Sequence, residues 1–108
     1  MTRFLFRRRR RSGSIRLPSG ESALVRILMQ AGMTVEEVIP PTERRTQNYQ
    51  GCWSIELTDP IHNHMGSSFY FHRYVEHAGL MLYDFLSRPG EQSALVCLIV
   101  GKPKRHEE

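Results

Sequence analysis

The 108-residue chain is predicted to fold as a small α+β domain, a ferredoxin-like βαββαβ sandwich with an antiparallel sheet and two main helices on one face. Three observations predict this class. Two stretches repeat apolar residues at helical spacing, several short stretches alternate or run apolar as strands do, and the length suffices for one hydrophobic core. We divide the chain into a basic segment 1–16, one α+β domain 17–101 and a charged tail 102–108.

The first third of the chain predicts a strand followed by helix. RFLFRRRRR, residues 3–11, begins with a short apolar stretch and is expected to form the first strand. A helix is predicted from Ser19, because an apolar stripe follows at i, i+3, i+4 and i+7 and a glycine then supplies a terminator. Thr34 and Glu37 stand at the spacing of a capping box, so a short helix is expected over 35–39, before two prolines.

The rest of the chain predicts a hairpin, a helix and a last strand. CWSIELT, residues 52–58, alternates apolar and polar side chains, which is typical of a half-buried strand. Turn-forming residues follow, and FYFHRY, residues 69–74, is predicted to be the returning strand of a long hairpin. The second main helix is expected over 75–87. The apolar run 94–100 predicts a strand covered on both faces.

Positive charge is concentrated at the start of the chain. The net charge is +4, yet residues 1–16 contain seven arginines and no acid, whereas the remainder has eight basic residues against eleven acidic ones. This asymmetry indicates contact with nucleic acid, because arginine binds phosphate with a planar fork. A solubilising arm and a nuclear-import signal are the alternatives. The candidate phosphate-binding residues are Arg3, Arg7, Arg8, Arg9, Arg10, Arg11, Arg16, Arg44 and Arg45.

Aromatic residues suggest a second nucleic-acid contact. The stretch GSSFYFHRY is faintly similar to the aromatic strand of RNA-recognition motifs, with Phe69, Phe71 and Tyr74 at the aromatic positions. Tyr70 and His72 depart from that pattern, where a small and an aliphatic residue are expected. The resemblance implies a strand face that stacks bases, for which Tyr70, His72 and Tyr74 are the candidates. Burial of Phe69 and Phe71 in the core is the favoured alternative.

Histidines cluster in the same region. His62 and His64 form an H-x-H pair, and neutral imidazole is a zinc ligand, so both are weak candidates for a metal site. No Cys-x-x-Cys or His-Glu-x-x-His pattern supports a metal, and we expect no cofactor. A histidine-dependent small ribonuclease is a third functional hypothesis, because histidine exchanges protons near neutral pH. No set of nucleophile, base and oxyanion donor stands out, so no catalytic residue is assigned.

Two further stretches are candidate binding sites. ALVRILMQAGMTVEEVI, residues 23–39, resembles a helix-turn-helix, but prolines end its second helix after about one turn, and an αα-corner is favoured. Leu80 and Tyr83 lie off the apolar stripe of the predicted helix 75–87. They are the expected contacts for a protein partner, with an open face of the sheet as the other such surface.

The leading prediction is a small nucleic-acid-binding or regulatory protein, and the alternative is a protein–protein interaction module, such as an inhibitor or adaptor, without catalytic activity. We expect a soluble cytoplasmic protein with no membrane contact, because no stretch approaches the about 18 apolar residues of a membrane helix. Cys52 and Cys97 stand in apolar runs, which favours buried thiols over a disulfide. The choice among DNA, RNA and protein, and the oligomeric state, stay open.

Overall fold

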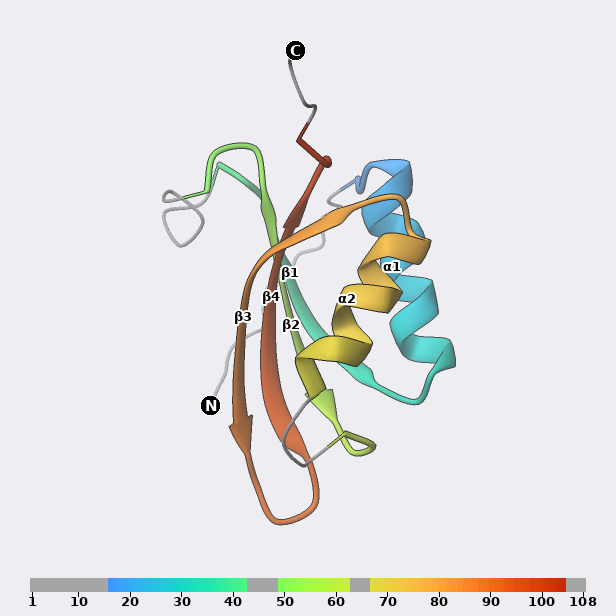
Figure 1. Ribbon diagram of the computed structural model, residues 1–108, viewed down its shortest axis with the longest axis vertical. Coiled ribbons are helices and arrows are strands. Elements are labelled where there is room, and N and C mark those ends of the chain that lie inside the picture. The colour runs from blue at the N-terminus through green and yellow to red at the C-terminus, as the bar shows by residue number, and fades with distance from the viewer. Residues whose placement is uncertain (1–15, 43–48, 63–66, 105–108) are drawn as a thin grey trace.

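Two helices and four strands make up the part of the chain that the computed structural model describes, residues 16–42, 49–62 and 67–104. The strands form one antiparallel sheet in the order β1-β2-β4-β3, and both helices cover the same face of it (Figure 1). The predicted α+β class is therefore confirmed. The elements are α1 (Ser19–Gln30), β1 (Thr34–Ile39), β2 (Trp53–Asp59), α2 (Ser67–His77), β3 (Met81–Pro89) and β4 (Ala94–Gly101).

The order of the elements differs from the ferredoxin-like prediction. Within the described ranges the chain runs α-β-β-α-β-β, and two hairpins, β1–β2 and β3–β4, join through antiparallel pairing of β2 with β4. The strand expected at residues 3–11 lies outside the described residues. The described elements thus do not follow the βαββαβ order, and the sheet is assembled from two successive αββ units.

The two αββ units end their helices in the same way. Each helix closes with a glycine in the left-handed region, Gly32 with φ 108° and Gly79 with φ 79°. In each case the residue after the glycine donates its N–H to the carbonyl five residues earlier, at 3.0 Å after α1 and 3.1 Å after α2. This Schellman arrangement satisfies carbonyls at the helix end and turns the chain into the next strand. The sequence reasoning recognised the first of these turns and missed the second.

A β-bulge near the start of each edge strand explains two wrong helix predictions. The pairing register shifts between Val35 and Glu37 in β1, and between Leu82 and Asp84 in β3. A bulge inserts one extra residue, so the core-facing side chains on either side of it stand three residues apart instead of two. That spacing imitates a helix. The segments predicted as the short helix and as the main part of the second helix are therefore edge strands.

The predicted strand FYFHRY is also wrong, since these residues belong to α2. Phe71 and Val75 are fully buried, and Tyr74 and Ala78 pack beside them, which is the i, i+3, i+4, i+7 stripe of an amphipathic helix. Phe69 is 60% exposed and takes no part in this stripe. The alternation of Phe69 with Phe71 was therefore coincidental, and the helix begins several residues before the predicted start.

The hydrophobic core lies between the layer of helices and the sheet, the two layers visible in Figure 1. Leu24 and Leu28 of α1, like the two buried residues of α2, have no exposed surface. The predictions of α1, β2 and β4 are confirmed, although Pro18 occupies the N-cap of α1 and no side chain caps it. The buried core residues of the strands are Trp53, Ile55 and Leu57 of β2, Leu82 of β3, and Ala94, Val96, Leu98 and Val100 of β4.

Candidate functional site: a groove on the open face of the sheet

The sheet has one face that no described helix covers. Successive side chains of a strand point to opposite faces, so the residues of β4 between the core positions face away from the helices. Leu95, Cys97 and Ile99 occupy these positions, and Leu95 is 55% exposed. The prediction that β4 is covered on both faces is therefore wrong at this end of the strand.

One end of the open face is closed. Tyr49, in the connection from β1 to β2, donates its hydroxyl to Asp84 of β3, with 2.6 Å between Oη and Oδ2. This hydrogen bond is the main cause that raises the pKa of Tyr49. Because the bond joins the connection to the far edge strand, it crosses the open face. Ile39, Ser54 and Ile99 are buried on this part of the sheet.

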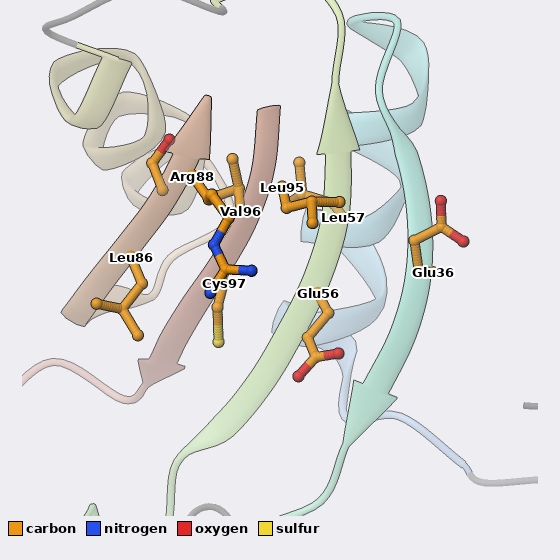
Figure 2. Close-up of a pocket in the computed structure, with 9 residues that line it drawn as sticks. Glu36, Glu56, Leu57, Leu86, Arg88, Leu95, Val96 and Cys97 are labelled. Carbon is orange, nitrogen blue, oxygen red and sulfur yellow. The ribbon is translucent and has the colours of Figure 1, made fainter. Parts of the chain in front are cut away.

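The other end of the open face holds a groove of about 430 Å³. All four strands line it, and Figure 2 shows its side chains from the open side of the sheet. Leu86 of β3 and Leu95 of β4 are 65% and 55% exposed. Arg88 projects between them over β4 (Figure 2). The groove therefore has an apolar side formed by β3 and β4.

Carboxylates form the opposite side of the groove. Glu36 of β1 and Glu56 of β2 line it, and Glu37 is paired with Glu56 across the two strands. The bulge in β1 brings Glu36 and Glu37 onto the same face, where regular alternation would separate them. Glu36 accepts a hydrogen bond from Thr58, with 2.8 Å between Oε2 and Oγ1. Glu36 and Glu56 supply the carboxylates that line the groove, opposite Arg88, so this side of the groove suits a cationic group of a ligand.

The two thiols differ in their surroundings and burial. Cys97 lines the groove, with its sulfur 3.2 Å from the hydroxyl of Ser54. Cys52 is 5% exposed and precedes the first residue of β2. Burial is the main cause that raises the pKa of its thiol. The cysteines form no disulfide, and the prediction of a buried thiol is confirmed for Cys52, whereas Cys97 is half-buried.

Most of the predicted phosphate-binding residues lie outside the described residues. Arg16 is exposed and directly precedes Leu17, which packs against the core before α1. The role of Arg16 in binding phosphate stays a prediction. The residues outside the described ranges are Arg3, Arg7, Arg8, Arg9, Arg10, Arg11, Arg44, Arg45 and His64.

The predicted base-contacting residues lie on α2, where Tyr70 and Tyr74 stand one turn apart beside His62, and His72 lies on another side of the helix. Tyr70 and His72 are exposed, whereas Tyr74 is half-buried, with its ring 5.7 Å from that of Phe71. Burial is the first cause that raises the pKa of Tyr74, and the charge of Asp59 adds to it. The three side chains therefore do not form the stacking platform expected of a strand, and their contact with bases stays a prediction.

His62 contributes to the turn that follows β2. Asp59 is fully buried, and its Oδ1 accepts the backbone N–H groups of Ile61 at 2.8 Å and of His62 at 3.0 Å. Its Oδ2 lies 3.2 Å from Nδ1 of His62, whose ring stacks on Tyr70 with centroids 4.3 Å apart. Among the described residues no three His, Cys, Asp or Glu side chains converge to hold a metal ion. Within that part of the chain, the geometry gives His62 a structural role.

The helix surface predicted around Leu80 and Tyr83 does not exist. Leu80 is 7% exposed and belongs to the core at the turn between α2 and β3. Tyr83 lies in β3 and donates its hydroxyl to the carbonyl oxygen of Lys102. Any part that these two residues take in binding a protein stays a prediction. The other surface expected for a protein partner, an open sheet face, is present.

The sequence reasoning missed the groove because its residues come from four different strands. Only the strand order brings Glu56 beside the segment containing Leu95. One signal in the sequence was available. Leu95 directly precedes a core-facing residue of its own strand, and because successive side chains point to opposite faces, it must lie on the outer face.

Comparisons with known proteins do not assign a function to this groove. No model of a known family matches the chain, and searches of curated proteins and of solved structures found no match either. No helix within the described ranges is long and apolar enough to cross a membrane. Cytoplasmic location stays a prediction.

Proposed function

We propose that this protein is an interaction module that holds a segment of a partner protein in the groove on the open face of its sheet. The observation that carries the proposal is the exposure of Leu86 and Leu95, at 65% and 55%, in one groove. Burial of a leucine side chain is worth about 1.5–3 kcal/mol. Covering the exposed halves of both leucines would therefore contribute about 2 kcal/mol to a complex.

The charge of the groove selects the chemistry of the partner. Glu36 and Glu56 line one side of the groove, and Arg88 lines the other. Complementary charge favours encounter and suppresses wrong partners. The proposed ligand is a segment that combines apolar side chains with lysine or arginine.

A synthetic peptide that alternates leucine and lysine serves as the probe, and its binding to the full chain is measured by fluorescence anisotropy. Replacement of both Leu86 and Leu95 by serine should weaken binding at least tenfold. The matched control is Met29→Ser, which removes a side chain that is 58% exposed on α1, away from the groove, and should leave affinity unchanged. Equal binding of a leucine–glutamate peptide, or equal loss in the control, would overturn the proposal.

Binding of nucleic acid by the basic segment is the second candidate. Residues 1–16 contain seven arginines and no acidic residue, and this concentration of positive charge favours nucleic-acid binding. Attraction to phosphates through counterion release predicts affinity for random DNA or RNA that falls at least tenfold between 50 and 200 mM salt, values chosen for the assay. Replacement of Arg7–Arg11 by glutamine should abolish this affinity with folding intact. Affinity that is insensitive to salt and to the replacement would remove this candidate.

A further inference from the structure

We propose that two copies of this chain associate through the outer edge of β3, where the two strands pair antiparallel about Leu86 and join the two sheets into one. The inference does not depend on the proposed function, because it concerns the edge of the sheet and not the occupant of the groove. Three features of β3 carry it: an outer edge with no described neighbour, a short accessible window, and a charge pattern that is complementary to itself.

The outer edge of β3 is accessible to another strand. Among the described strands the order is β1-β2-β4-β3, so β3 pairs with β4 on one side only and is an outermost strand of the sheet in Figure 1. The backbone groups along the outer side of an edge strand are a template for pairing with another chain. Residues 86–89 are exposed, and Leu86 is 65% exposed. The second half of β3 can therefore receive a second strand.

Two features that oppose strand pairing lie on either side of this accessible part. The bulge between Leu82 and Asp84 interrupts the regular ladder at one end. Pro89, at the other end, has no backbone N–H to donate to a neighbour. Residues 84–88 lie between them and pair with β4 in an uninterrupted register. The window for a second copy therefore spans five residues, with Leu86 at its centre.

The side chains of this window complement themselves. Asp84, Leu86 and Arg88 face away from the helices, because they pair with the three residues of β4 that lie on the open face. When two such strands pair antiparallel about Leu86, each residue lies opposite the one that is equally far beyond the centre. Asp84 of each copy then faces Arg88 of the other, and the two Leu86 side chains meet. Opposite charges and apolar side chains are favourable cross-strand pairs.

The second copy supplies a better partner for Asp84 and Arg88 than either residue does for the other within one chain. Four residues along a strand span about 13 Å. Residues directly opposite each other on paired strands have Cβ atoms only about 4.5–5.5 Å apart. Asp84 accepts hydrogen bonds from the hydroxyl of Tyr49 at 2.6 Å and from the backbone N–H of Phe85 at 2.8 Å. A carboxylate offers about four acceptor sites, so Asp84 can also accept from a guanidinium group.

Pairing through β3 closes the assembly at two copies. The joined sheet would have β1 at both of its ends. The sequence of β1, TVEEVI, contains no basic residue, so two copies of β1 offer no pair of opposite charges. The contact at β3 is isologous, with the same residues on both sides of a two-fold axis, as in most homodimers.

The two grooves would lie next to each other in the dimer. The two-fold axis stands perpendicular to the sheet, so both open faces are on the same side. Leu86 lines each groove and lies at the axis, and Figure 2 shows it on the open face together with Arg88. A segment longer than one groove would then contact both copies.

Sedimentation velocity of the full chain measures the association. The interface is smaller than a standard protein–protein interface, so the average mass should rise from one chain to two between about 1 and 500 μM. Arg88→Glu and Asp84→Lys should each weaken association at least tenfold, because like charges then face each other. The matched control is Arg26→Glu, which reverses the charge of an exposed arginine on α1 and should leave association unchanged.

A mixture of the two charge-reversed variants tests the register of the pairing. Arg88→Glu leaves acidic residues at both positions and Asp84→Lys leaves basic residues at both, so each variant repels itself and complements the other. The equimolar mixture should therefore recover the dimer. Recovery also shows that both variants are folded, which circular dichroism of each one checks separately.

Cross-linking tests the centre of the pairing. In a chain that carries Cys97→Ser, Leu86→Cys should form a disulfide between copies under mild oxidation, because directly opposite residues have Cα atoms about 4.5–5.5 Å apart, within disulfide reach. Leu95→Cys in the same background is the matched control, since Leu95 is 55% exposed in the same groove. It lies one strand further from the axis, so its two copies would stand at least about 14 Å apart and should not cross-link.

Four results would overturn the inference. A mass of one chain at every concentration would show that no second copy uses the edge. Association of Arg88→Glu and of Asp84→Lys as strong as that of the unmodified chain would place the contact elsewhere. A mixture of these variants that stays monomeric would contradict the register, and equal cross-linking at positions 86 and 95 would contradict its centre.

Discussion

Two leucines of β4 test the assignment of the faces of the sheet. Leu98 has no exposed surface and faces the helices, whereas Leu95 is 55% exposed on the open face. Replacement of a fully buried leucine by alanine costs about 3 kcal/mol, within a wide range set by how far the site relaxes. About half of the surface of Leu95 is already in water, so its replacement by alanine should lower the free energy of unfolding by only about 1 kcal/mol. Leu98→Ala should therefore lower the free energy of unfolding by about 2 kcal/mol more than Leu95→Ala.

Urea denaturation followed by the fluorescence of the single tryptophan, Trp53, measures both values, because that residue is 9% exposed and lies in the core. Loss of strand propensity is common to the two substitutions and cancels in the comparison. Leu86→Ala, on β3 in the groove, provides a second exposed position and should resemble Leu95→Ala. Equal destabilisation by Leu95→Ala and Leu98→Ala would refute the open face, and with it the groove.

Other predictions concern the turns and the response to alkaline pH. Asp59→Ala should lower stability by about 2 kcal/mol in thermal unfolding, because two partly buried backbone N–H groups lose their acceptor. Gly32→Ala and Gly79→Ala should each cost about 1–2 kcal/mol in urea, because alanine must adopt the positive φ of these turns; a cost near zero would contradict the helix ends described. Burial raises the pKa of Cys52 and of Tyr74, so the folded chain retains these protons to higher pH than the unfolded chain. The stability that they contribute is complete below the unfolded pKa values and is lost as pH rises through the folded ones, so the urea midpoint should fall above about pH 9. Tyr74→Phe should flatten that decline, and an unchanged pH profile in this variant would reject the explanation.

Local sequence patterns were informative where an element follows its period without interruption. The stripe of α1, the alternation of β2 and the apolar run of β4 each extend over several residues, and all three elements were predicted correctly. The bulges of β1 and β3 broke the period of two, and the helical stripe of α2 began inside a stretch that also alternates. A bulge is stabilised by pairing with a neighbouring strand, so the local sequence of the edge strand alone does not reveal it.

The sequence by itself determined the α+β class, the positions of three elements, and the separation of a basic segment from a more acidic remainder. The tertiary structure alone decided which strands form the edges, which face stays open, and that Leu86, Leu95 and the carboxylates of β1 and β2 line one groove. The physical reason is that side chains of a sheet become neighbours through the order and register of strand pairing. These pairings join residues far apart in the chain, whereas periodicity reports only on residues a few positions from one another.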